Sequence, residues 1–332
     1  MRRHVPLGST AVLLASAVVA AATGYHLTGE IKIGGEGGWD YLTVDSAAKR
    51  LYVSHATHVV VVDLASDKVV GDIPDTPGVH GIAIAAELNR GFISNGRGNN
   101  VTVFDVKTLK PISQVPTGDN PDSIRYDAVS GRVFAFNGRS KSATAIDAKT
   151  GQVAATITLP GKPEFSVADG KGKLYVNIED TSELVEIDAA KATLTKKYSL
   201  APCDGPSGLA IDTTKRRLFS VCTNRVMAIS DPDAGKVIAT PPIGVGPDGA
   251  AFDPGTGYAF SSNGDGTLTV VQQTGGNWET VENIATERGA RTIAIDEKTH
   301  ILYLPTALSA TPTPGARSAF VPGTFKILVV GK

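Results

Sequence analysis

The stretch PDSIRYDAVSGRVFAFNGRSKSATAIDAKTGQVAATI (121–157) contains four short apolar runs that are separated by polar turns. Runs of this length and alternation, with Gly, Asp, Asn and Lys between them, predict four consecutive antiparallel strands. The same order of phrases recurs about every 42 residues along almost the whole chain. Such a unit cannot bury both of its faces alone, and it is typical of one blade of a β-propeller.

Seven copies of the unit lie in one register. Their first phrases are WDYLTVD (39–45), VHGIAIA (79–85), PDSIRYD (121–127), PEFSVAD (163–169), PSGLAID (206–212), PDGAAFD (247–253) and ARTIAID (290–296). Their second phrases are RLYVS (50–54), RGFIS (90–94), RVFAF (132–136), KLYVN (173–177), RLFSV (217–221), YAFSS (258–262) and ILYLP (301–305). We therefore predict an all-β chain that forms one seven-bladed β-propeller over residues 23–332, with blades that bury each other's faces.

The last blade lacks a strand in the C-terminal sequence. Strands are predicted at 292–296, 301–304 and 325–330, after which the chain has two residues left. The stretch YHLTGEIKI (25–33) is strand-like and belongs to no other unit. We expect it to pair with the C-terminal strand, because a closed ring leaves no open sheet edge between its first and last blades.

The N-terminus is typical of a signal peptide, predicted over residues 1–22. Arg2 and Arg3 supply its positive end, and AVLLASAVVAAA (11–22) is an apolar run of small residues. The run is short for a membrane span, so no stable span is expected after cleavage near Thr23. These features predict a periplasmic or secreted protein.

The charge balance disfavours nucleic acid as a partner. The chain has 32 basic and 33 acidic residues. Removal of Arg2 and Arg3 leaves 30 and 33, a net charge of −3. Phosphate backbones require a concentrated basic surface, which this composition does not provide.

The units VDSAAKRLYVSHATHVVVVDLASDKVVGDI (44–73) and IDTTKRRLFSVCTNRVMAIS (211–230) resemble the repeat of the YVTN-type seven-bladed propellers. The resemblance covers residues 25–332, although LYVSH (51–55) stands in place of YVTN and VVQQTGGNWET (270–280) lacks the usual Asp-containing turn. It implies the propeller fold and an extracytoplasmic binding or scaffold role, mostly without a defined reaction.

One end of the predicted ring carries unusual residues. Strand direction alternates within a blade, so the starts of the inner strands and the ends of the second strands share one face. The inner-strand starts read Asp40, His80, Asp122, Glu164, Ser207, Asp248 and Arg291. The second-strand ends and the turns after them add His55, Asn95, Arg97, Asn137, Arg139, Asn177, Glu179, Cys222, Asn263, Asp265 and Thr306. Asn-Gly pairs also favour tight turns, so the asparagines have a structural interpretation as well.

Several hypotheses fit this charged face. The carboxylates and His80 could hold a divalent metal ion, joined by His55 if it is a transition metal. Arg97, Arg139 and Arg291 could instead grip a small anionic molecule. A third interpretation is an ion-pair network that neutralises itself around a water-filled channel.

These interpretations lead to three functions. The chain is a binding protein, with a protein partner docking at the same face as a further option. Alternatively it is a metal-dependent lactonase- or lyase-type enzyme, in which Glu164 and Asp248 hold the metal and His80 acts as acid or base. The third is a protein-interaction scaffold. No nucleophile elbow, P-loop, zinc-protease or haem motif is present to decide among them.

Two further features complete the sequence predictions. Cys203 and Cys222 map to the same face of the fifth blade, and an oxidising compartment would join them as a disulfide. The stretch 306–324, rich in Pro, Ala, Ser and Thr, is predicted to be a long loop on the charged face, where it is either a lid or an unstructured connection.

Overall fold

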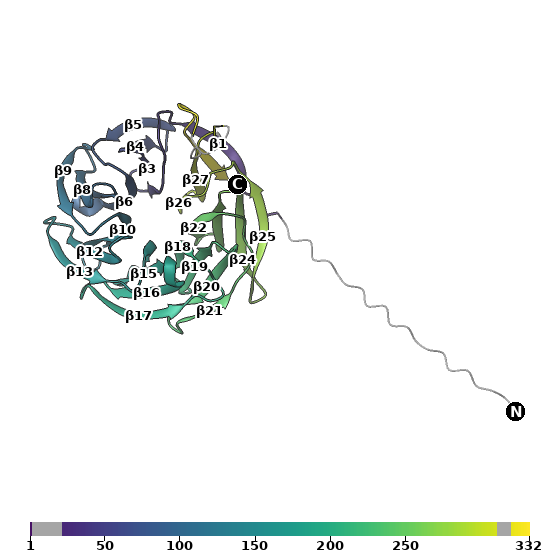
Figure 1. The fold of residues 1–332 in the computed structure, drawn as a ribbon. Coiled ribbons are helices and arrows are strands. Elements are labelled where there is room, and N and C mark those ends of the chain that lie inside the picture. The colour runs from purple at the N-terminus through teal and green to yellow at the C-terminus, as the bar shows by residue number, and fades with distance from the viewer. Residues whose placement is uncertain (2–21, 311–319) are drawn as a thin grey trace.

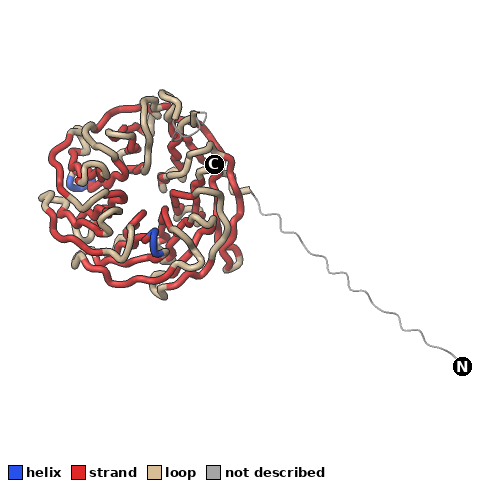
Figure 2. Tube along the Cα trace, in the orientation of Figure 1, coloured by secondary structure: helices blue, strands red, loops and turns tan. Residues whose placement is uncertain are grey.

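The computed structural model describes residue 1, residues 22–310 and residues 320–332 of the chain (Figure 1). Residues 2–21 of the predicted signal peptide and residues 311–319 of the long loop lie outside the described part. Figure 2 shows strands arranged around an open centre, and in the described residues helix is confined to the single turns η1 (Ala86–Leu88) and η2 (Glu179–Thr181). Neither of these described helices has the length and apolar character of a membrane span.

Seven four-stranded antiparallel sheets make up the ring, as the sequence predicts. The first blade contains β2 (Leu42–Asp45), β3 (Arg50–His55), β4 (His58–Asp63) and β5 (Lys68–Ile73). The second contains β6 (Val79–Ala85), β7 (Arg90–Asn95), β8 (Asn100–Asp105) and β9 (Pro111–Pro116). The third contains β10 (Pro121–Asp127), β11 (Arg132–Asn137), β12 (Ser142–Asp147) and β13 (Val153–Thr158). The fourth contains β14 (Pro163–Ala168), β15 (Lys173–Ile178), β16 (Glu183–Asp188) and β17 (Thr193–Ser199). The fifth contains β18 (Pro206–Asp212), β19 (Arg217–Cys222), β20 (Val226–Asp231) and β21 (Lys236–Ala239). The sixth is β22 (Pro247–Asp253), β23 (Tyr258–Asn263), β24 (Thr267–Thr274) and β25 (Asn277–Ala285).

The seventh blade combines the two ends of the chain. Its strands are β26 (Ala294–Asp296), β27 (Ile301–Thr306), β28 (Lys326–Gly331) and, on the outside, β1 (His26–Lys32). β1 is antiparallel to β28, with His26 opposite Gly331 and Lys32 opposite Lys326. This pairing confirms the predicted closure of the ring by an N-terminal strand.

The core lies between the blades. Phe134 and Phe136 of β11, for example, share one buried cluster with Leu174 and Val176 of β15 in the next blade. Both faces of the middle strands are therefore buried, which is why these strands read as nearly continuous apolar runs. Each blade depends on its neighbours for stability, as expected for a repeat architecture.

The Asp that ends most first phrases caps the turn that follows it. Oδ1 of Asp212 accepts hydrogen bonds from the backbone N–H groups of Thr214 and Lys215, both at 2.9 Å. Asp45, Asp253 and Asp296 accept the corresponding bonds in their own blades. The repeated acidic residue thus has a structural role, because an Asp side chain satisfies N–H groups that the turn leaves unpaired.

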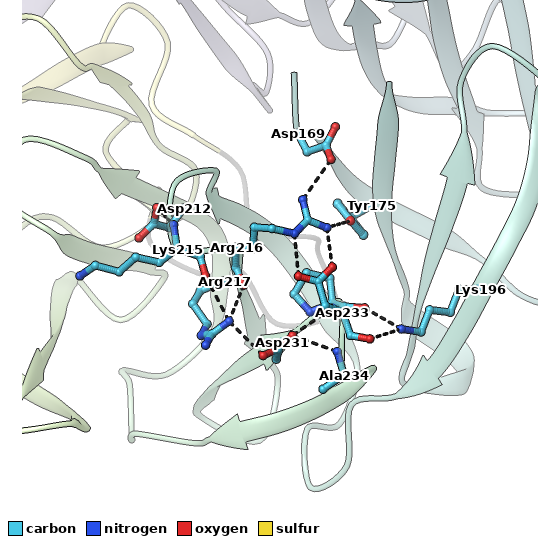
Figure 3. Close-up of polar contacts among 11 residues, drawn as sticks. Asp169, Tyr175, Lys196, Asp212, Lys215, Arg216, Arg217, Asp231, Asp233 and Ala234 are labelled. Carbon is cyan, nitrogen blue, oxygen red and sulfur yellow. Dashed lines mark hydrogen bonds and ion pairs between the residues drawn. The ribbon is translucent and has the colours of Figure 1, made fainter. Parts of the chain in front are cut away.

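An ion-pair network joins blades four and five at the face opposite the charged one (Figure 3). The Arg216 guanidinium donates to both carboxylate oxygens of Asp233 at 2.8 Å and to the hydroxyl of Tyr175 at 3.0 Å. It also reaches Asp169 of the neighbouring blade at 3.3 Å. These charges are satisfied within the protein and tie two blades together.

The predicted disulfide between Cys203 and Cys222 is present. Their Cα atoms are 5.5 Å apart, and both residues are buried. The bond attaches the loop that enters the fifth blade to the end of β19. It is therefore a local staple at the charged face.

Candidate functional site

The mouth of the channel gathers six ionisable residues from six blades. Asp40, His80 and Asp122 form one group, with one ligand atom from each lying within 4.8 Å of the others. Nδ1 of His80 is 2.6 Å from Oδ2 of Asp40 and 3.6 Å from Oδ1 of Asp122. Glu164, Asp248 and Arg291 complete the set at the same position of three other blades, and Ser207 holds that position in the fifth blade. We call these six residues the channel mouth.

Serine and threonine hydroxyls fix the backbone that carries these side chains. The N–H of Asp40 donates to Oγ of Ser54 at 2.8 Å, and its carbonyl accepts from Thr292 of the neighbouring blade at 2.6 Å. Ser94 donates to the carbonyl of Asp122, and Ser262 to that of Arg291. In these last two cases the second strand of one blade positions the inner strand of the next.

Asp122 has an unsatisfied polar atom. The residue is 8% exposed, and its Oδ1 accepts no hydrogen bond from the described residues. The glycine at position 96 leaves room beside this group, because a Cβ there would lie 2.6 Å from Nε2 of His80. His80 is thus packed so that its Nδ1 faces the two aspartates.

Two ion pairs occupy the rest of the mouth. Lys162 lies in the loop before β14 and binds Glu164 at 2.5 Å, and it also binds Glu179 of η2. Arg291 binds Asp248. The repeating register does not indicate Lys162, because this residue precedes the inner strand. Its position two residues before Glu164 was the available signal.

The electrostatics of the mouth follow from crowding and burial. Burial opposes charge on His80, but the hydrogen bond to Asp40 and the nearby carboxylates outweigh it and raise the His80 pKa to about 9. Burial raises the pKa of Asp248 to about 7 despite Arg291. Burial also raises the pKa values of Asp122 and Glu164, and repulsion from neighbouring carboxylates adds to both shifts. The mouth therefore holds more carboxyl groups than it can keep ionised at neutral pH.

Three of the four asparagines predicted for the site lock hairpins, and the fourth binds the backbone of the next blade. Nδ2 of Asn95 donates to Asn100 at 2.6 Å and Thr102 at 2.8 Å, which locks the turn between β7 and β8. Asn137 and Asn263 make the same kind of bond in their own blades, and Asn177 bonds to the backbone of blade five. All four are buried.

The remaining predicted residues divide between turn and surface. Asp265 is exposed and accepts from the N–H groups of Val245 and Thr267 at 2.7 and 3.0 Å. Arg97 and Arg139 are exposed, and neither forms an ion pair with another described residue. The structure does not bring them to the carboxylates of the mouth.

His55 is buried away from the mouth. Its ring stacks on Phe325, with centroids 4.5 Å apart, and neither ring nitrogen has a hydrogen-bond partner among the described residues. Burial, with a smaller contribution from His58, lowers the His55 pKa to about 4. His55 is therefore neutral at physiological pH and packs as an aromatic side chain.

Two aromatic residues from blades one and four meet across the channel. Tyr41 of the first blade meets Phe165 of the fourth edge to face, with centroids 4.9 Å apart. The Arg125 guanidinium lies over the same Phe165 ring at 5.3 Å. All three side chains line the central cavity.

Comparison with known proteins gives the fold alone. No protein-family model and no curated protein matches the chain, so membership of the YVTN-type family is not confirmed. The structure is similar to Kuenenia stuttgartiensis hydrazine synthase at 15% identity and a TM-score of 0.70, over 81% of this chain and 92% of that one. Structures described as U3-55K and as the RRP9 WD40 repeats each give a TM-score of 0.77 at 7% identity. They cover 90% and 94% of this chain, and 97% and 99% of their own.

Proposed function

We propose that this chain is a periplasmic or secreted binding protein that holds a divalent metal ion through Asp40, His80 and Asp122. The observation that carries the proposal is the buried Oδ1 of Asp122, which accepts no hydrogen bond and faces Nδ1 of His80. A buried polar atom without a partner is costly, and a metal ion would supply that partner. The disulfide supports the extracytoplasmic location.

The donor set favours a transition metal. One imidazole and two carboxylates suit zinc or manganese, whereas calcium and magnesium prefer oxygen ligands alone. Binding would replace the proton on His80 and would offset the repulsion between Asp40 and Asp122. With ligand distances of about 2.0–2.2 Å, the close His80–Asp40 pair would have to open slightly.

An anionic ligand has weaker support at this mouth. Five carboxylates gather there, from Asp40, Asp122, Glu164, Glu179 and Asp248, against three cationic groups, from His80, Lys162 and Arg291. Lys162 and Arg291 are already paired with carboxylates. An excess of carboxylates attracts cations.

Calorimetric titration of the chelator-treated protein with zinc and with manganese tests the proposal. We expect one equivalent to bind with an affinity that Asp122→Asn and His80→Phe each reduce at least tenfold. Affinity should also rise between pH 6 and pH 8, because a His80 pKa of about 9 means that the metal must displace a proton.

Asp119→Asn is the matched control, since Asp119 is an exposed carboxylate in the loop before the same strand. It should bind metal as the unmodified protein does. If neither metal binds, or if Asp122→Asn and Asp119→Asn have equal effects, the proposal is wrong.

A further inference from the structure

Thr23 is buried, although the residue before it is not. Thr23 is 7% exposed, whereas Ala22 is fully on the surface. Two residues later Tyr25 is buried as well, with its hydroxyl donating to Oδ2 of Asp253 at 3.0 Å. The Tyr25 ring packs edge to face on Phe260, with centroids 5.1 Å apart. Tyr25 thereby anchors the segment that leads into β1 and fixes the place of Thr23.

One carboxylate holds Thr23, that of Glu282 on β25 in the sixth blade. The backbone N–H of Thr23 donates to Oε2 of Glu282 at 2.8 Å, and the Thr23 hydroxyl donates to the same oxygen. The hydroxyl oxygen accepts in turn from the N–H of Tyr25 at 3.3 Å. Thr23 is thus bound to the blade beside its own, at the rim of the ring where β1 and β25 lie (Figure 1).

Glu282 has no cationic partner among the described residues. It is half-buried, and the only described donors to its carboxylate are the two of Thr23. The Lys332 ammonium of the adjoining C-terminus lies instead over the rings of Tyr25 and Tyr258, at 5.1 and 5.2 Å. A partly buried carboxylate is stabilised by an opposite charge within hydrogen-bond distance, so a positive charge on the Thr23 nitrogen would complete this site.

We propose that export processing hydrolyses the Ala22–Thr23 peptide bond and that the new α-amino group of Thr23 forms an ion pair with Glu282. This inference rests on the proposed export. An export peptidase would add water across the bond: the oxygen enters the carboxylate of Ala22, and the nitrogen of Thr23 becomes an amine that is mostly protonated at pH 7. That nitrogen already lies 2.8 Å from Oε2 of Glu282, so the pair requires no rearrangement.

The contact with Glu282 selects one cleavage position among several. Small residues with the A-x-A spacing that export peptidases prefer occur at ASA (15–17) and at AAA (20–22). Cleavage after residue 17 would leave an uncharged amide at Thr23, and cleavage beyond Thr23 would remove both donors to Glu282. Cleavage after Ala22 alone places a charge at the carboxylate. The ion pair therefore stabilises the processed chain and not its precursor.

Intact mass and N-terminal sequencing test the cleavage. The full chain is expressed in a Gram-negative host, and the protein is purified from the periplasmic extract. We expect its first residue to be Thr23. An exported chain with another first residue overturns this inference and leaves the proposed export standing, whereas an uncleaved chain retained in the cytoplasm contradicts both. Metal titration of the same protein reports separately on the channel mouth.

Acylation of the α-amino group tests the ion pair. Acetic anhydride in limiting amount reacts with the uncharged amine at pH 7, and mass spectrometry of the N-terminal peptide measures the rate. We expect Glu282→Gln to speed this acylation at least threefold, because the carboxylate favours the charged amine. Glutamine retains an oxygen acceptor, so the comparison isolates the charge.

Glu279→Gln is the matched control, since Glu279 is an exposed carboxylate on the same strand. It should acylate at the rate of the unmodified protein. Thermal unfolding checks that both variants are folded. Equal rates in folded Glu282→Gln and in the unmodified protein, or an equal increase in Glu279→Gln, would overturn the ion pair.

Discussion

Asp248 is the residue at which burial and ion pairing compete most clearly. It pairs with Arg291, yet burial and the repulsion of Asp40 and Asp122 raise its pKa to about 7, from an ordinary value of 3.8. A carboxyl group with a raised pKa stabilises the folded state below its unfolded pKa. That stabilisation is lost as the pH rises through the folded value.

We therefore predict that the metal-free protein loses stability between pH 4 and pH 7 relative to Asp248→Asn. The difference in unfolding free energy should change by up to about 1.4 kcal/mol per pH unit. Denaturant unfolding of both proteins across this range measures it. Parallel pH profiles would show that Asp248 is already ionised throughout.

The disulfide stabilises one element, the loop that enters the fifth blade. Closing a loop of 19 residues contributes about 3 kcal/mol in the chain-entropy model. We expect the double variant Cys203→Ser, Cys222→Ser to have an unfolding free energy lower by about 3 kcal/mol. It should therefore unfold at a lower denaturant concentration while remaining folded at 25 °C. Equal stability of the double variant and the oxidised protein would contradict this prediction.

The strand β1 stabilises the last blade through one buried side chain. Ile31 is 3% exposed, whereas Leu27 on the same strand is 43% exposed. We predict that Ile31→Asp lowers the unfolding free energy by several kcal/mol, because it places a charge in the core, and that Leu27→Asp changes it by less than about 1 kcal/mol. Thermal and denaturant unfolding of both variants measure the contrast. Similar losses for the two variants would argue against this account of the closure.

At the scale of the molecule, the repeat made the fold predictable. The seven first phrases share a register, and the last blade visibly lacked a strand that residues 25–33 could supply. The same register predicted that Asp40, His80 and Asp122 share one end of the ring, although whether they bind a ligand is a separate question. These inferences needed only the period and the alternation of strand direction.

The features that sequence did not show depend on distances across the ring. The contact between Tyr41 and Phe165 joins blades one and four, so it follows from the channel diameter and not from any local pattern. His55 meets Phe325, which lies far along the chain. The role of the asparagines could not be predicted from the sequence. An asparagine at the end of a second strand can either stabilise the hairpin or line the channel, and both roles occur at the same sequence position.

The geometry of closure predicts that one rearranged chain will fold. His26 lies opposite Gly331, and a Cβ added at Gly24 would lie 3.9 Å from Cγ of Lys332, so the two ends are adjacent. A chain that begins at residue 34 and carries residues 25–33 after Lys332 through a short turn should form the same ring. We expect its melting temperature to lie within a few degrees of the original, and that of a chain that simply lacks residues 25–33 to lie well below.

The pairing of β1 with β28 has a consequence for synthesis. A ribosome makes β1 first and its partner last, so the first strand waits for almost the entire translation before it has an edge to join. A premature stop before residue 326 leaves both β1 and β27 without the strand that lies between them. Incomplete chains thus carry open edges, and proteases and chaperones can distinguish them from finished ones.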